Sequence, residues 1–165
     1  KGTLHEGGIR VPAIVRWPGR VPGGRTTDQS TITMDWTATL LAIGGATPDP
    51  AYPLDGLDLS PLCRGEPVHF DRAIFWRTSL ADAARRGRWK YLQTDRHESL
   101  FDIPRDPSEA ADLAAYEPKT LTSLGAAFRE WNAQMLPRPA ASGRWPSADR
   151  TVAAARLAFR PSGPR

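Results

Sequence analysis

The strongest constraint on the fold is a stripe of large apolar side chains in the last third of the chain. These side chains recur at alternating spacings of three and four residues, at Leu121, Leu124, Phe128, Trp131 and Met135. This spacing places all five on one face of an α-helix, and Pro118 is suited to its first turn. A helix with one apolar face needs an apolar surface to cover. The pattern therefore predicts a helix from Pro118 and assigns the five residues to the core rather than to a ligand site.

Three short runs before this helix can supply that surface. Residues 73–76 and 88–93 are rich in aromatic and large apolar side chains, and residues 99–102 form a third run. Arg86-Gly87 provides a turn before the second run, in which polar and apolar residues alternate. A few short strands form a stable antiparallel meander only when another element covers one face. We therefore expect a small antiparallel sheet with one packed helix.

The first part of the chain has a different pattern. Residues 11–17 form a short apolar run that ends at a Pro-Gly pair, which predicts a buried strand. A helix is expected over about 36–43, with Asp35 as its cap and a Gly-Gly pair as its stop. Residues 46–70 are expected to be mostly loop.

These patterns divide the chain into residues 1–70, residues 71–136 and a Pro- and Arg-rich tail over residues 137–165. The tail carries six arginines and one acid, a net charge of +5, so the rest of the chain sums to −1. A short helix is expected within it, over residues 148–159. Because no basic residues alternate with aromatic ones along the body of the chain, the overall charge of +4 does not predict nucleic-acid binding.

The sequence has no feature typical of a membrane span or of a disulfide framework. No apolar run approaches the ~20 residues that a spanning helix needs, and no signal peptide opens the chain. The single cysteine, Cys63, is interpreted as a small and partly buried apolar side chain. Because the chain begins with Lys1 and its first methionine is Met34, we expect a processed or excised piece.

A search for a self-contained active site gives no result. The three histidines, His5, His69 and His97, are too far apart in sequence to suggest a metal site. Neither a Gly-x-Ser-x-Gly elbow nor a phosphate-binding Gly-rich loop is present. The carboxylates of Asp55 and Asp58 are more typical of turns and caps than of an acid–base pair. No metal ligand is therefore predicted.

The opening segment is the one candidate that remains. It has the sequence Lys1-Gly2-Thr3-Leu4-His5-Glu6-Gly7-Gly8-Ile9-Arg10-Val11-Pro12. The compact charge of Lys1 suits a tetrahedral oxyanion, and glycines allow a ligand to approach the backbone closely. These residues alone indicate an anion site or a simple connection. They also resemble the lysine segment of the sulfatase family, Gly-Lys-Gly-x-x-x-Glu-Gly-Gly-x-Arg-x-Pro.

Further segments resemble sulfatase motifs in the family's order, over about residues 1–135. They begin with Trp-Pro-Gly at residues 17–19 and an Asp-x-x-x-Thr-Leu helix at 34–40, in which Ala38 replaces the usual proline. An Asp-Gly-x-Asp-Leu-Ser-Pro-Leu loop follows at 54–62 and an Arg-x-Gly-x-x-Lys-Tyr hairpin at 85–91. The last is a Leu-Phe-Asp…Asp-Pro-x-Glu…Asp-Leu ending at 100–113. The resemblance implies the C-terminal portion of a sulfatase. It also implies the α/β fold class. Residues 1–70 would then hold the last strand and helix of the large mixed-sheet α/β domain, and 71–136 the small subdomain.

The resemblance also implies roles for single residues. Lys1 matches the lysine that contacts the substrate sulfate, so it is the expected catalytic and substrate-binding residue. His5 stands where many members have tyrosine, near the mouth of the site, and is a second substrate-binding candidate. Glu6 and Arg10 are expected to be structural and to orient the loop through backbone and ion-pair contacts.

The parts that this sequence lacks limit what it is expected to do alone. The formylglycine nucleophile of sulfatases arises from a Cys/Ser-x-Pro-x-Arg motif, which Cys63 does not fit. The calcium ligands precede the lysine segment in family order. We therefore expect the chain to be inactive alone, and to act on a sulfate ester together with the remainder of a sulfatase domain. A phosphonate or phosphodiester hydrolase of the same superfamily and a non-catalytic module are the alternatives. Sulfatases are often exported, but this sequence assigns no compartment.

Overall fold

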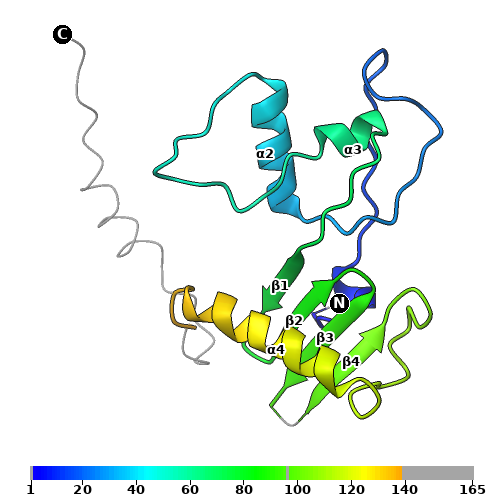
Figure 1. The fold of residues 1–165 in the computed structure, drawn as a ribbon, viewed down its shortest axis with the longest axis vertical. Coiled ribbons are helices and arrows are strands. Elements are labelled where there is room, and N and C mark those ends of the chain that lie inside the picture. Colours follow the sequence, from blue (N-terminus) through cyan, green and yellow to red (C-terminus); the bar gives the residue numbers. More distant parts are fainter. Residues whose placement is uncertain (1, 96, 139–165) are drawn as a thin grey trace.

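The computed structural model describes residues 2–95 and 97–138, and its centre is a four-stranded antiparallel sheet (Figure 1). The strands lie side by side in sequence order, as β1 (Ala73–Arg77), β2 (Ala81–Arg86), β3 (Trp89–Thr94) and β4 (Glu98–Asp102). Three of them are the predicted runs, so the predicted meander is confirmed. The additional strand, β2, is rich in alanine and arginine and lacks the branched and aromatic residues typical of strands. It forms because it pairs along its whole length with β3 and over residues 82–86 with β1.

Helix α4 (Pro118–Ala133) covers one face of this sheet (Figure 1). Leu124 and Phe128 are buried there against Ala84, Tyr91 and Leu100. The predicted helix and its inward face are therefore confirmed over four of the five apolar positions. Met135 is the exception, because the helix ends before it and it is 37% exposed.

The opposite face of the sheet is covered by the opening segment of the chain. Leu4 is buried in a cluster with residues of three elements and a turn, namely Ala83, Leu92, Phe101 and Ile103. Burial of one such leucine contributes about 1.5–3 kcal/mol to stability. Because both faces are covered, the consecutive residues Ala83 and Ala84 point to opposite sides and are both 0% exposed.

Two further helices lie beyond the sheet, α2 (Thr33–Ile43) and α3 (Ser60–Arg64), on the side from which the chain enters β1 (Figure 1). The prediction placed Asp35 before the first of them, but the helix begins two residues earlier. Asp35 lies in its first turn and accepts a hydrogen bond from the backbone N–H of Ile32 at 2.8 Å. Helix α3 was not predicted. It begins where the Asp58 carboxylate accepts from the Ser60 backbone N–H, also at 2.8 Å.

The prediction of a buried strand over residues 11–17 is wrong for this chain. The segment is extended, but Val11 is 79% and Ile14 is 92% exposed. A strand needs a neighbour that pairs with its backbone. Among the described residues the only sheet is that of β1–β4, which this segment does not join. Leu40 and Ile43 of α2, predicted to share a helix face, are likewise 65% and 42% exposed.

Two expectations stay predictions. The short helix expected over residues 148–159 lies outside the described residues, and the boundaries near residues 70 and 136 remain predictions. Within the described residues, none of the helices has both the length and the apolar character needed to cross a membrane.

Candidate functional site

The two predicted site residues belong to the opening segment, of which the structure describes all but the first residue. Lys1 lies outside the described residues. His5 is exposed and directly precedes α1 (Glu6–Ile9), a single helical turn. Its backbone carbonyl accepts hydrogen bonds from the N–H groups of Gly8 at 2.8 Å and Ile9 at 3.1 Å. The side chain of His5 is therefore free to face solvent or a ligand, while its backbone is held.

The turn is compact because one of its glycines touches the chain just before it. A Cβ atom at Gly8 would lie 2.1 Å from the carbonyl oxygen of Thr3, whereas a Cβ at Gly7 would meet nothing within 4 Å. The tight contact folds residues 3–8 back on themselves. The glycine-rich opening, predicted to be a loop, therefore has one position where only glycine fits.

Glu6 connects this turn to the sheet. The guanidinium of Arg85 donates to its Oε2 at 2.9 Å, and the ammonium of Lys90 donates to its Oε1 at 3.0 Å. Glu6 is 5% exposed and the side chain of Lys90 is 0% exposed. The ion-pair role expected for Glu6 is confirmed. Arg10 is exposed, and within the described part of the chain it contributes a backbone hydrogen bond to Glu6 but no ion pair.

A second carboxylate completes this buried network. The Lys90 ammonium lies 2.8 Å from Oε1 of Glu109, while Oε2 of Glu109 accepts the backbone N–H of Glu6 at 2.5 Å. Arg85 and Lys90 are direct neighbours across the β2–β3 ladder, where two like charges would repel. The two glutamates balance them, so the four residues are together neutral. We call Glu6, Arg85, Lys90 and Glu109 the loop anchor.

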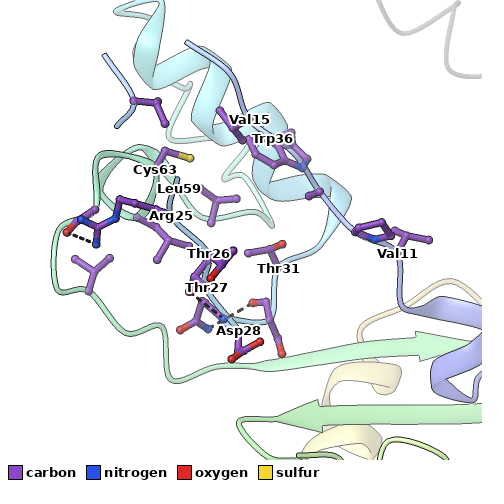
Figure 2. A pocket seen from close by; sticks show the side chains of 18 of the residues that line it. Val11, Val15, Arg25, Thr26, Thr27, Asp28, Thr31, Trp36, Leu59 and Cys63 are labelled. Atoms are coloured by element: carbon purple, nitrogen blue, oxygen red, sulfur yellow. Dashed lines mark hydrogen bonds between the residues drawn. The ribbon is translucent and has the colours of Figure 1, made fainter. Parts of the chain in front are cut away.

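A groove of about 660 Å³ opens beside the loop anchor and runs toward α2 and α3 (Figure 2). Its walls come from the extended segment with Val11 and Val15, from residues 25–31, and from Trp36 of α2 (Figure 2). Cys63 also lines it. Burial raises the pKa of the Cys63 thiol, with a smaller contribution from Asp58. The thiol is therefore protonated near neutral pH, which agrees with its interpretation as a small apolar side chain.

The Asp-Gly motif over residues 54–62 packs against α2 rather than against the opening segment. Asp35 is 0% exposed and accepts from the backbone N–H of Leu57 at 2.9 Å and from the guanidinium of Arg72. Burial alone would raise the pKa of this carboxyl, but these bonds and that from Ile32 outweigh it and lower the pKa below its usual value. A Cβ at Gly56 would lie 2.2 Å from the Met34 carbonyl oxygen. The motif is structural, as expected.

The second acidic motif, over residues 100–113, is also structural. The Asp102 carboxylate pairs with Arg88, which lowers the pKa of that carboxyl. Asp112 accepts backbone N–H groups of Leu100 at 3.0 Å and Ala114 at 2.9 Å, and its other oxygen lies 2.8 Å from Nε2 of His97. Across the described residues there is no group of three or more His, Cys, Asp or Glu side chains placed to hold a metal ion.

Known proteins place this arrangement in one family, although no family model matches the chain. Human arylsulfatase A is 36% identical over 132 residues, which are 75% of this chain and 26% of that protein. The choline-sulfatase of Rhizobium meliloti is 35% identical over 120 residues, 69% of this chain and 23% of that protein. The crystal structure of Ps i-CgsB matches with a TM-score of 0.63 and 28% identity, covering 70% of this chain and 27% of that one.

Sequence and structure therefore agree on the class of protein. The chain is a member of the sulfatase family, homologous to the C-terminal portion of sulfatases. It spans about a quarter of the length of the curated relatives that it matches. The mixed α/β fold of this chain, with its four-stranded antiparallel sheet and packed helix, thus matches part of that solved structure.

Proposed function

We propose that this chain forms the C-terminal part of a sulfuric ester hydrolase, in which the opening segment lies at the sulfate site. The observation that carries the proposal is the match of residues 1–12 to the sulfatase lysine segment, within a chain that is homologous to sulfatases. In this proposal the Lys1 ammonium contacts a sulfuryl oxygen and offsets the charge that develops there during S–O cleavage. His5 lies at the mouth of the site and contacts the rest of the substrate.

The loop anchor supports this placement of Lys1. Glu6 is five positions after Lys1, and a fully extended chain spans at most ~3.6 Å per residue, so their Cα atoms lie within about 18 Å of each other. Glu6 itself is fixed by its contacts with Arg85, Lys90 and Glu109. The described part of the segment that follows Lys1 lies on the face of the sheet opposite α4, next to the groove.

The unpaired apolar surface supports the proposed division of the chain. Val11 and Ile14 are highly exposed in an extended segment, as are Leu40 and Ile43 on α2. In the proposal, residues 1–70 supply the last strand and helix of a larger sheet domain, which would pair with this segment and cover α2. Residues 71–136 form the smaller subdomain, and residues 137–165 form a basic tail.

Calcium and formylglycine are the groups that sulfatase homology implies for the whole enzyme. The described residues do not fit either group. They contain no acidic cluster placed for a metal ion, and Cys63 lies outside any Cys-x-Pro-x-Arg motif, with its thiol pKa raised. We therefore assign both groups to the remainder of the proposed enzyme, and the contribution of this chain is limited to substrate contact and to support of the loop.

The proposed substrate is a sulfate ester, without a more specific assignment of its alcohol. The names of the matching proteins include an arylsulfatase, a choline-sulfatase and an N-acetylgalactosamine-6-sulfatase, which differ in the group that carries the sulfate. One solved structure that matches this chain contains a neocarrahexaose, an oligosaccharide. What these proteins share is the sulfate ester, which is the part that a compact lysine charge can recognise.

Replacement of Lys1 in the whole enzyme tests the proposal. Removing one electrostatic contact to a developing oxyanion typically lowers the rate by about 10²–10³-fold, so Lys1→Ala should lower kcat on an aryl sulfate by that factor. Lys1→Arg should restore only part of it, because a planar guanidinium does not place its charge where an ammonium does. Lys119→Ala is the matched control, since Lys119 is exposed on α4, on the other face of the sheet.

The same assay separates the proposal from its alternatives. Near-normal turnover by Lys1→Ala would remove the opening segment from the sulfate site. Hydrolysis of an aryl phosphate or a phosphodiester in preference to an aryl sulfate would assign the enzyme to the phosphorus branch. Absence of either activity in the wild-type whole protein would leave a non-catalytic module.

A further inference from the structure

Lys90 is the least expected residue in the interior of this protein. Its side chain is 0% exposed at the second position of β3, on the face of the sheet that also carries Leu92. Transfer of an ammonium group out of water is costly unless ion pairs and hydrogen bonds replace the lost hydration. Glu6 and Glu109 supply those partners at 3.0 Å and 2.8 Å.

Packing alone gives no reason for a lysine at this position. The cross-strand neighbour of Lys90 on β4 is Phe101, and Leu4 lies in the same apolar cluster as Leu92 and Phe101. An apolar side chain at position 90 would extend this cluster, and exchange of buried ion pairs for apolar residues is often neutral or stabilising. The buried charge of Lys90 therefore has a role other than packing, and its two carboxylate partners, Glu6 and Glu109, indicate what that role is.

Both carboxylate partners of Lys90 hold the same piece of backbone. Glu6 is the first residue of α1, and its backbone N–H donates to the second partner, Glu109. The two side-chain oxygens of Glu6 are occupied by Arg85 and Lys90. A residue held through its backbone and through both carboxylate oxygens has little freedom to shift or rotate. Leu4, on the other side of His5, is buried in the sheet, so the backbone of His5 is fixed from both sides.

We propose that Lys90 is a positioning residue for the opening segment. Its buried ammonium sets the distance of that segment from the sheet and its orientation relative to the sheet. The inference rests on the proposed function where it concerns catalysis, because the segment then carries Lys1 and His5. Lys90 does not touch the substrate. It acts through Glu6 and Glu109, which in turn position Lys1 and His5, the groups proposed to contact the substrate.

The test in the whole enzyme compares Lys90→Met with a matched control. Methionine has a similar length but no charge, so it removes the partner of both glutamates and keeps most of the volume. Arg86→Met is the control, because the neighbouring Arg86 pairs with Asp71 at the surface, with side-chain exposures of 54% and 63%. A small displacement of a catalytic group costs on the order of 10²-fold in rate, so Lys90→Met should lower kcat by about 10–100-fold while KM changes much less. Arg86→Met should leave both unchanged.

A second measurement distinguishes failure of this inference from failure of the proposed function. Hydrogen exchange of the Gly8, Ile9 and Arg10 amides, which bond to the carbonyls of His5 and Glu6, reports the order of the turn without any assay of activity. In Lys90→Met these amides should exchange at least ~10-fold faster than in the wild type, with the β1–β2 ladder unchanged. If the wild-type enzyme has no sulfatase activity, this readout alone decides whether Lys90 orders the segment.

Glu6→Gln decides the question if Lys90→Met fails to fold. Glutamine keeps the shape of Glu6 but removes the charge that both Arg85 and Lys90 contact. We therefore expect faster exchange of the turn amides and a lower kcat than in the wild type, with smaller changes than in Lys90→Met. A purely structural role predicts a different result for either variant, namely a lower melting temperature with normal exchange of the turn and normal kcat per folded molecule. That result would overturn the proposal.

Discussion

Gly7 and Gly8 are neighbours in the same helical turn, but their surroundings differ. A Cβ at Gly8 would overlap the Thr3 carbonyl, and a Cβ at Gly7 would point into open space. Gly8→Ala should therefore force the turn open and lower the free energy of unfolding by about 1–3 kcal/mol. Gly7→Ala should be neutral or stabilising by up to about 1 kcal/mol, because alanine favours a helix more than glycine does. Urea denaturation of the two variants checks this, and equal effects would contradict the described turn.

The lowered pKa of Asp35 gives a prediction of how the stability of the protein depends on pH. Its folded-state pKa is lowered below the usual value of about 3.9, so its stabilising effect is fully present above that pH and is lost as the pH falls through the folded pKa. Asp35→Asn should be less stable than wild type at pH 7 and should lose less stability below about pH 4. Denaturation midpoints measured between pH 7 and pH 2 test this. Asp55→Asn, on an exposed residue of the nearby loop, should keep the wild-type acid response.

At the scale of elements, α4 is joined to the sheet mainly through aromatic side chains. Phe128 is 2% exposed, and its ring centroid lies 6.3 Å from that of Phe75 on β1 and 6.4 Å from that of Tyr91 on β3. Phe128→Ala should cost about 3–5 kcal/mol, since it leaves a cavity between helix and strands. Tyr116→Ala, which truncates an aromatic residue that is 80% exposed, should change stability by less than about 0.5 kcal/mol. Thermal or urea unfolding measures both.

The elements that could be predicted from the sequence are those whose local pattern and tertiary environment agree. Helix α4 has a clear helical period, and the sheet that buries its apolar face is present in the same chain. Strand β2 has no such pattern, because its small residues are selected by close packing on both faces. Residues 11–17 show the opposite case. Their pattern is typical of a buried strand, but the described residues contain no strand that pairs with them.

The candidate site could be predicted only in part for a similar physical reason. The role of Glu6 is predicted by the sequence, but its partners are not. Arg85, Lys90 and Glu109 are distant from it in sequence, and charged residues of these types are usually found on the surface. The one available indication was the alternation in β3, which places Lys90 on the same side as Leu92. A charge at an apolar position of an alternating strand indicates a buried ion pair.

At the scale of the whole molecule, burial differs between the two parts of the chain. The sheet and α4 contain most of the buried apolar residues, whereas the segment around Ile14 and the Leu40 face of α2 are exposed. Hydrogen exchange of this chain should therefore show stronger protection over residues 71–136 than over residues 1–70. Equal and strong protection throughout would show that the first part is stable without further partners, or that it is covered by a second copy of the chain.

The loop anchor also affects when this protein can complete its fold during synthesis. The contacts of Glu6 reach residues that are 79, 84 and 103 positions later in the chain. At a translation rate of ~5–20 residues per second, the opening segment is made on the order of 5–20 s before its last partner leaves the ribosome. During that interval Glu6 is an unpaired charge beside an exposed leucine. The segment that carries the proposed sulfate contact is thus synthesised well before the residues that anchor it, and it reaches its final conformation only after they are made.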